Sequence, residues 1–174
     1  MKSPICIWFT GLPGSGKTTL AHTYLERLKS KGILAVNLDG DEIRKSLCSD
    51  LGFTYADRLE NIRRVSEVNK ILLDNQLNVI NSFVSPTESI RTKARNIIGS
   101  HRFILVFVDA PLAVCMERDP KGMYRINNPI QGNNFTGLGQ DFEVPEYSDI
   151  RLDTHNFSIE ECIEQLELKL IPYF

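Results

Sequence analysis

An eight-residue glycine-rich motif near the N-terminus is the feature that most constrains how this chain can fold. Residues 11–18 read Gly-Leu-Pro-Gly-Ser-Gly-Lys-Thr and match the pattern G-x-x-x-x-G-K-[ST] in full. The apolar run Ile5–Phe9 precedes the motif, and a helical pattern begins at Lys17. In this setting the glycines let successive backbone N–H groups point at one phosphate, and the positive end of the helix adds to the attraction. The motif therefore predicts a phosphate-binding loop between a buried strand and a helix.

Short apolar runs typical of buried parallel strands recur along the chain. They occupy residues 5–9, 33–38, 77–83 and 103–108, with a weaker run at 149–152. Helical patterns lie between them, the first at Lys17–Lys31 before a natural stop at Gly32. This alternation predicts an α/β fold of the P-loop NTPase and kinase type: an open, parallel, five-stranded sheet with helices on both faces. Ligands of such sheets bind at the carboxyl ends of the strands.

Capping boxes mark where two further helices are expected to begin. Asp57 with Glu60 predicts the start of one helix, and Ser158 with Glu161 predicts the start of the last one. Residues 119–142 break the alternation because they are rich in Gly, Pro and Asn and lack a hydrophobic period. A loop this long is typical of a lid that excludes water from an activated phosphate.

Length, charge and cysteine content limit the alternatives. We expect one kinase domain over residues 1–174, with the lid inside it. The net charge of −2 gives no general attraction to nucleic acid or to a membrane surface, and no apolar stretch reaches the length of a transmembrane helix. The four cysteines are far apart and lack a CxxC pair, which favours reduced thiols in a cytoplasmic protein.

The glycine-rich motif assigns the donor side of a phosphoryl transfer, with ATP and Mg²⁺ as the expected ligands. Lys17 is expected to bridge the β- and γ-phosphates, and the Thr18 hydroxyl to ligate Mg²⁺. The residues predicted to bind ATP are Gly11, Gly14, Ser15, Gly16, Lys17, Thr18 and Thr19.

The second apolar run ends in Asp39-Gly40-Asp41, at the edge of the sheet where the phosphate loop is also expected. Asp39 is suited to hold Mg²⁺ through water, and Asp41 to accept the proton of an attacking hydroxyl group. The alternative is a polar turn in which Asp41 caps a helix over residues 42–47. Spacing alone does not separate the two interpretations.

Residues 50–64 combine an aromatic residue with several arginines. Arg58 and Asn61 are three residues apart and share a helix face. Arginine suits phosphate or sulfate oxygens, and Phe53 is suited to stack on a base. Taken by itself, this pattern is also that of a solvated, charged helix face.

Taken together, these motifs resemble those of the adenylylsulfate kinase family, which makes 3′-phosphoadenylylsulfate from adenylylsulfate and ATP. The resemblance runs from Ile7 to about Pro145. The matching stretches are IWFTGLPGSGKTT, LDGDEIRKSL, DLGFTYADRLENIRRVSEV, SFVSP, VFVDAPLAVCMERDPKGMY, NFTGL and EVPE. This combination is far more specific than the glycine-rich loop alone.

The resemblance implies roles for individual residues, beginning with the acceptor nucleotide. The positions that grip it match Arg44, Phe53, Arg58 and Asn61, with Phe135 as a second aromatic wall. Asp39 and Asp41 match the Mg²⁺ and catalytic acidic positions.

Three further positions carry implied roles. Ser85 matches a serine that lies beside the acceptor and is phosphorylated in some members of the family. Arg118 and Lys121 match the start of the lid over the donor nucleotide. Members of the family are commonly homodimers.

The chain also departs from the family pattern. Thr87 and Glu88 stand where relatives have Tyr and Arg, and Arg125–Asn128 replaces a more basic run in the lid. Lost positive charge near the acceptor leaves room for another nucleotide, such as the cytidine diphosphoramidate used by a related branch in capsule modification. An alternative of another class is a non-catalytic, nucleotide-responsive module. The intact acceptor residues, Asp41 and Arg58 among them, argue against that alternative.

Overall fold

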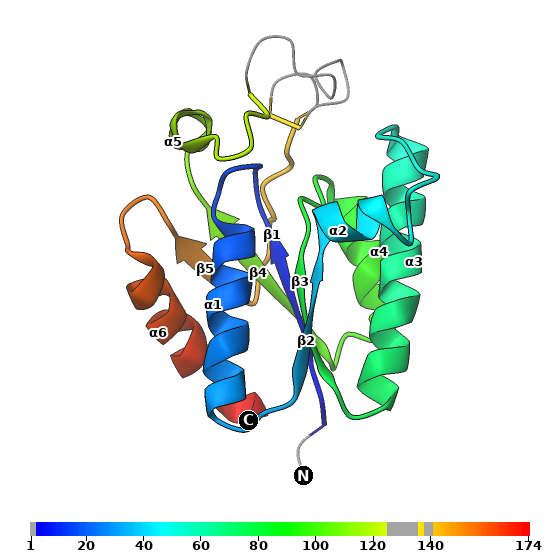
Figure 1. Ribbon diagram of the computed structural model, residues 1–174, viewed down its shortest axis with the longest axis vertical. Helices are drawn as coiled ribbons and strands as arrows, with labels where there is room; N and C mark the ends of the chain where they lie inside the picture. The colour runs from blue at the N-terminus through cyan, green and yellow to red at the C-terminus, as the bar shows by residue number, and fades with distance from the viewer. Residues whose placement is uncertain (1–2, 125–135, 138–140) are drawn as a thin grey trace.

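A five-stranded parallel sheet forms the centre of the molecule (Figure 1). The computed structural model describes residues 3–124, 136–137 and 141–174. The strands lie in the order β2-β3-β1-β4-β5, and every neighbouring pair is parallel. They are β1 (Cys6–Thr10), β2 (Ala35–Asp39), β3 (Asn78–Ser82), β4 (Phe103–Asp109) and β5 (Ile150–Asp153). The predicted five-stranded parallel sheet is therefore confirmed.

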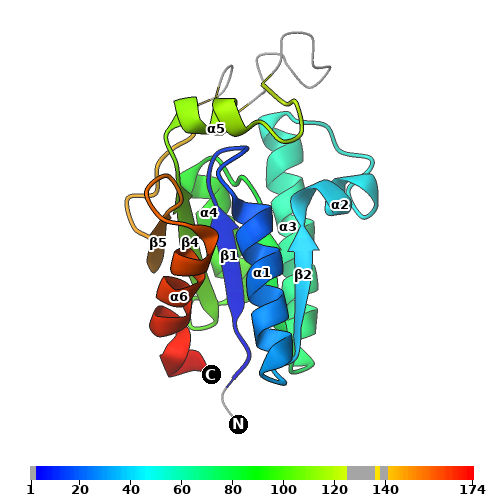
Figure 2. The same cartoon turned by 60° about the vertical axis from the view of Figure 1, so that its left-hand side comes forward.

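Helices cover both faces of this sheet. The helices are α1 (Lys17–Ser30), α2 (Gly40–Lys45), α3 (Tyr55–Asp74), α4 (Glu88–Ile98), α5 (Leu112–Arg118) and α6 (Ile159–Leu170), followed by a 3₁₀ turn at Ile171–Tyr173. Figures 1 and 2 show α1 and α6 on one face, and α3 and α4 on the other. Among the described helices, none is long and apolar enough to cross a membrane.

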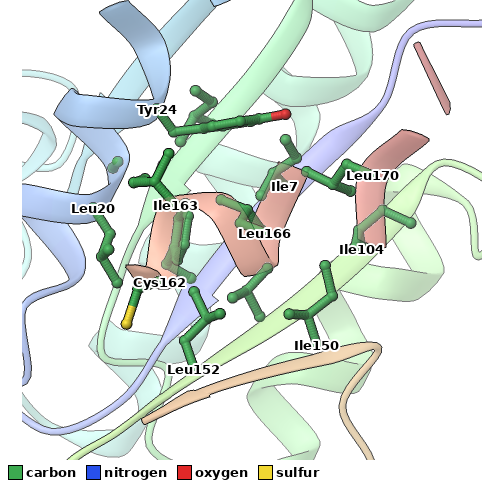
Figure 3. Close-up of a cluster of buried hydrophobic side chains, with 14 of the residues drawn as sticks. Ile7, Leu20, Tyr24, Ile104, Ile150, Leu152, Cys162, Ile163, Leu166 and Leu170 are labelled. Carbon is green, nitrogen blue, oxygen red and sulfur yellow. The ribbon is translucent and has the colours of Figure 1, made fainter. Parts of the chain in front are cut away.

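Each face of the sheet has its own core because side chains alternate along a strand. In β1, Ile7 and Phe9 pack with α1 and α6, whereas Cys6 and Trp8 pack with α3 and α4. Figure 3 shows the first core, in which Ile163 of α6 lies beside Leu20 of α1, and Leu166 of α6 belongs to the same cluster. All four cysteines are buried and free of disulfides.

The helix starts test the predicted capping boxes. The box at Ser158 and Glu161 is present, and α6 begins directly after it. The box expected at Asp57 and Glu60 is wrong, because Thr54 caps α3 and reciprocates with Asp57 one turn earlier. Glu60 instead accepts hydrogen bonds from Arg63 and Arg64, the two arginines that follow it on the same helix face.

The order of the strands decides where a ligand can bind. From β1 the chain moves to β2 and β3 on one side, then returns past β1 to β4 and β5 on the other. β1 and β3 are neighbours, but the connection after β1 runs to β2 on one side of the sheet, and the connection after β3 runs to β4 on the other side. The carboxyl end of β1 is therefore a topological switch point. The glycine-rich loop follows β1 directly, so the fold places it there.

Candidate active site

A cleft of about 700 Å³ lies at the carboxyl ends of the strands and gathers most of the predicted site residues. The predicted residues that line it are Gly14, Gly16, Lys17, Thr18, Thr19, Asp39, Asp41, Arg44, Phe53, Arg58, Asn61, Ser85, Arg118 and Lys121. Gly11 and Ser15 lie in the same loop, just behind its lining, and Ser15 is fully buried. Phe135 and the Arg125–Asn128 run lie outside the described residues.

The glycine-rich loop is built around close backbone contacts. Gly14 has φ +76°, and a Cβ atom placed there would lie 2.7 Å from the carbonyl oxygen of Cys115 in α5. Thr154 closes the loop from the other side, since its hydroxyl donates to the carbonyl oxygen of Ser15 at 2.8 Å. Glycine is required at residue 14 both for the left-handed conformation and for the approach of α5.

Lys17 lies across the mouth of this loop with 8% of its surface exposed. Its Nζ donates to the carbonyl oxygens of Gly11 at 3.0 Å and Leu12 at 2.7 Å. Burial lowers the pKa of Lys17 to about 8, because a desolvated ammonium group is disfavoured. A bound triphosphate brings the compensating negative charge, so ligand binding is expected to raise this pKa again.

This pKa predicts how ATP affinity depends on pH. Above about pH 8 the free protein loses the Lys17 proton, so binding ATP must recover it, and affinity falls. We expect the dissociation constant for ATP, measured in EDTA to exclude metal effects, to be flat from pH 6.5 to 7.5. It should then rise roughly 30-fold by pH 9.5, because that pH is about 1.5 units above the pKa of Lys17 in the free protein. A Lys17→Arg variant should bind ATP with no such rise, and a flat profile in the wild type would contradict the assignment.

Oxygen atoms suited to Mg²⁺ converge beside the loop. Asp39 Oδ2 accepts hydrogen bonds from the hydroxyl groups of Thr18 at 2.9 Å and Ser82 at 2.8 Å. Burial alone would raise the pKa of Asp39, but these bonds and one from the Asp41 N–H lower it overall, which keeps the carboxylate charged at neutral pH. A hydroxyl and a carboxylate are the hard oxygen ligands that Mg²⁺ prefers. These two residues therefore fit the ion that the sequence predicts.

The two aspartates of the Asp39-Gly40-Asp41 turn have different positions. Asp39, not Asp41, is the N-cap of α2, because its Oδ1 accepts from the N–H of Asp41 at 2.9 Å. The alternative in which Asp41 caps the helix is therefore wrong. Asp41 lies in the first turn of α2 at the cleft, where its carboxylate pairs with Lys121, 80 residues further along the chain. This leaves the Asp41 side chain in the cleft rather than committed to the helix backbone.

Arg118 is anchored to Thr154, the residue that also contacts the glycine-rich loop at Ser15. Its guanidinium donates to the backbone carbonyl of Thr154 at 2.6 Å and to the Thr154 hydroxyl at 3.3 Å. Sequence reasoning missed Thr154, which is 4% exposed and lines the cleft with Phe157. Its position directly after the last strand, at the carboxyl edge of the sheet, is the signal that could have identified it.

Two arginines flank the ring of Phe53 in the part of the cleft that is formed by α2, α3 and the loop between these helices. The guanidinium carbon of Arg44 is 4.4 Å from the centre of the Phe53 ring, and that of Arg58 is 5.8 Å away. Arg58 Nε also donates to the Phe53 carbonyl oxygen at 3.1 Å. Burial, and then the charge of Arg44, lower the pKa of Arg58 to about 10, so both arginines stay charged at neutral pH. Two cations held close together in a partly buried site favour an anionic ligand.

Asn61 points to a ligand for a different reason. Its side chain is 2% exposed and lines the cleft, and among the described residues its Nδ2 makes no hydrogen bond of ordinary geometry, with only the weakly accepting Cys48 thiol beside it. Most buried polar groups are bonded, and an exception in a cleft is typical of a group reserved for a ligand. Asn69, two turns further along the same buried face of α3, is fully bonded to Asn81 at 2.8 and 2.9 Å.

The contrast between these two asparagines gives a prediction. We expect Asn61→Leu to leave the melting temperature within about 2 °C of the wild type while raising KM for the acceptor nucleotide about tenfold. The matched control, Asn69→Leu, leaves Asn81 unsatisfied and should lower the melting temperature by roughly 5 °C. Thermal unfolding and steady-state kinetics measure both. A destabilised Asn61→Leu with unchanged KM would contradict the role of Asn61 in binding.

Ser85 lines the cleft as expected, but Glu88 does not. The Ser85 hydroxyl accepts a hydrogen bond from Trp8 Nε1 at 3.0 Å, and the residue is 3% exposed. Glu88 pairs with Arg91 on α4 at 2.9 Å, and Thr87 caps that helix. The Glu88 carboxylate is thus engaged with Arg91 and not with the cleft, while the expected loss of positive charge at residue 88 stays a prediction.

The sequence is similar to one family over most of its length. The family model described as adenylylsulphate kinase matches residues 3–153. The adenylyl-sulfate kinase of Marinobacter nauticus is 46% identical over 165 residues, which cover 95% of this chain and 83% of that protein. The adenylyl-sulfate kinase of Bacteroides thetaiotaomicron is 45% identical over 168 residues, which cover 97% of this chain and 84% of that protein.

The structure is similar to solved members of the same group. The Mycobacterium tuberculosis APS kinase CysC in complex with AMPPNP and APS has a TM-score of 0.91 at 38% identity, covering 98% of this chain and 99% of that one. The hexameric APS kinase of Thiobacillus denitrificans has a TM-score of 0.72 at 30% identity, covering 97% of this chain and 29% of that one. A Sinorhizobium meliloti gluconokinase, at 18% identity and a TM-score of 0.65, shares the fold alone.

Proposed function

The chain belongs to the adenylylsulfate kinase family, and from this we propose that it transfers the γ-phosphoryl group of ATP to the ribose 3′-hydroxyl of adenylylsulfate. The products are 3′-phosphoadenylylsulfate and ADP. The observation that carries this proposal is a single cleft lined both by the glycine-rich loop and by Arg44, Phe53 and Arg58. A phosphate donor and an anionic nucleotide acceptor thus share one cavity, which phosphoryl transfer requires.

The donor side of the cleft is assigned to ATP. Backbone N–H groups of residues 14–18 and the ammonium group of Lys17 bind the phosphates, at the N-terminus of α1. Arg118 and Lys121 add positive charge around the donor. Thr18 and Asp39 would hold Mg²⁺ beside the loop, and the ion would supply positive charge that offsets the charge of the phosphate oxygens.

The acceptor side is assigned to adenylylsulfate. Arg44 and Arg58 bind its phosphate and sulfate oxygens, and Phe53 offers an aromatic surface to its base. Asn61 donates its Nδ2, which makes no ordinary hydrogen bond within the described residues, to the same nucleotide. Phe135 is proposed as the second aromatic wall, from the family resemblance alone.

Asp41 is assigned the proton of the acceptor hydroxyl. As the 3′-oxygen attacks the γ-phosphorus and the bond to the leaving oxygen of ADP breaks, the hydroxyl proton moves to the Asp41 carboxylate. Lys17 stabilises the negative charge on the transferred group and on ADP. Ser85 lies beside the acceptor, and its phosphorylation would place negative charge in the cleft.

A coupled assay of ADP release tests this function. We expect adenylylsulfate to stimulate turnover at least tenfold above basal ATP hydrolysis, and cytidine diphosphoramidate to do so weakly or not at all. Preference for the cytidine compound would move the chain to the capsule-modification branch. Absence of stimulation by either acceptor would favour the non-catalytic, nucleotide-responsive module.

We also propose that the chain assembles with copies of itself in the cytoplasm. Support for assembly comes from the hexameric APS kinase of Thiobacillus denitrificans, and support for a reducing compartment comes from the four buried, free thiols. Analytical ultracentrifugation tests assembly directly. Sedimentation as a single 19.8 kDa chain at micromolar concentration would contradict it.

A further inference from the structure

Arg91 of α4 is a buried charge that the proposed mechanism does not use. Its side chain is 2% exposed, whereas its ionic partner Glu88 is 53% exposed. The guanidinium Nε and Nη2 donate to Glu88 Oε2 at 3.2 and 2.9 Å. Nη1 is directed elsewhere and donates to the carbonyl oxygen of Ser85 at 2.9 Å. A buried arginine is costly to desolvate, so its placement calls for a specific role.

The carbonyl group that Arg91 holds belongs to an unusual turn. Ser85 has φ +44°, in the left-handed region that residues other than glycine rarely adopt. Ser85 and Pro86 follow β3 and line the cleft on the same side of the sheet as α2 and α3. Those two helices and the loop between them supply Arg44, Phe53 and Arg58, so the turn belongs to the acceptor side. Such a turn persists only where surrounding contacts determine it.

Arg91 also contacts the chain where the predicted lid segment ends. Its guanidinium carbon is 5.8 Å from the ring centre of Phe142, which stacks on Phe107 of β4. The next residue, Glu143, donates its N–H to the Pro86 carbonyl oxygen at 2.8 Å and accepts from the Glu88 N–H at 2.6 Å. Two parts of the chain that are distant in sequence therefore meet at one guanidinium group: residues 85–88, which form the turn and the start of α4, and Phe142.

We infer that Arg91 is a positioning residue for the acceptor: its planar guanidinium group holds the Ser85–Pro86 turn in the shape that walls the acceptor side of the cleft. This inference rests on the proposed function. The donor side is built on the other half of the sheet, by the loop after β1, α5 and the turn after β5. A change at Arg91 should therefore affect the acceptor much more than ATP.

Arg91→Lys tests this role because lysine keeps the charge but loses the planar fork. One ammonium group cannot reproduce the divergent bonds to Ser85 and Glu88. We expect KM for adenylylsulfate to rise about tenfold, while KM for ATP changes less than about twofold. The matched control is Arg95→Lys, one turn along α4. Arg95 is also ion-paired, to Asp149 at 3.1 Å, and lies over Phe103, but its ion pair is with the segment before β5 and not with the Ser85–Pro86 turn.

The control should lose some thermal stability and keep both KM values. If Arg91→Lys behaves in the same way, or raises both KM values equally, Arg91 is merely structural and the inference is overturned. Should Arg91→Lys not fold, Glu88→Gln decides instead: this half-exposed change weakens the hold on Arg91 and should raise KM for adenylylsulfate about threefold. An unchanged KM there overturns the inference equally. A wild-type chain that does not turn over adenylylsulfate overturns the proposed function itself, which is a separate outcome.

Discussion

An Asp41→Asn variant is expected to lose about 10³-fold in kcat while its affinity for ATP changes less than about threefold. Asparagine has nearly the same shape, but its amide cannot accept the proton of the attacking 3′-hydroxyl. ATP affinity is retained because the phosphates are held by the loop after β1 and by Lys17, while Asp41 belongs to the next strand-to-helix turn. Single-turnover kinetics and calorimetric titration with ATP measure the two quantities separately.

The neighbouring residue supplies the control for this change. Glu42 also lies in the first turn of α2, but it pairs with Lys45 at 2.7 Å and does not line the cleft. Glu42→Gln should therefore keep the wild-type kcat. If Asp41→Asn retains more than about one tenth of the wild-type kcat, Asp41 is not the base. Its ion pair with Lys121 would then serve a role other than proton transfer.

Gly14→Ala is expected to weaken ATP binding at least about 100-fold, because the new methyl group must displace the glycine-rich loop. The Cβ atom would lie 2.7 Å from the Cys115 carbonyl oxygen, where neither the loop nor the backbone of α5 can give way cheaply. The left-handed φ adds about 1 kcal/mol of strain. Calorimetric titration with ATP measures the loss of affinity, and thermal unfolding measures the loss of stability.

A Gly32→Ala variant distinguishes the effect of backbone strain from the effect of steric contact with a neighbouring segment. Gly32 has φ +70°, close to the +76° of Gly14, but no described atom lies within 4 Å of the Cβ position at Gly32. Its alanine variant should lose about 1 kcal/mol of stability, about 2–4 °C in melting temperature, and keep its ATP affinity. Equal ATP affinities for the two variants would show that contact with α5 does not shape the loop.

Local patterns in the sequence predicted the sheet and much of the cleft. Each of the five strands lies within or next to its predicted apolar run, because a buried parallel strand needs a continuous apolar segment. The donor loop was predictable for a similar reason: glycine freedom, the lysine and the following helix are all contained in residues 11–18. The family resemblance added the acceptor residues, and Arg44, Phe53, Arg58 and Asn61 do meet in one cleft with that loop.

Errors arose where one residue had several partners within reach. Both Asp39 and Asp41 can cap a helix, and the choice of Asp39 depends on Thr18 and Ser82 holding its other oxygen from two different segments. At residue 88 the sequence shows only that a cation is lost; it does not show that the Glu88 carboxylate pairs with Arg91, one helical turn away. Charge alone does not determine which way a side chain turns.

The sequence by itself determined the class of fold, the phosphate loop and the family, because these depend on short patterns of polarity and backbone freedom. Only the tertiary structure decided which groups face one another across the cleft. Lys121 meets Asp41 and Thr154 closes the loop at Ser15, while Arg91, which does not line the cleft, joins Ser85 to Phe142. These contacts span from 6 to 139 positions in sequence, and most exist because parallel strands bring their carboxyl ends to one edge of the sheet. The positions of these residues in the sequence do not by themselves predict that they meet.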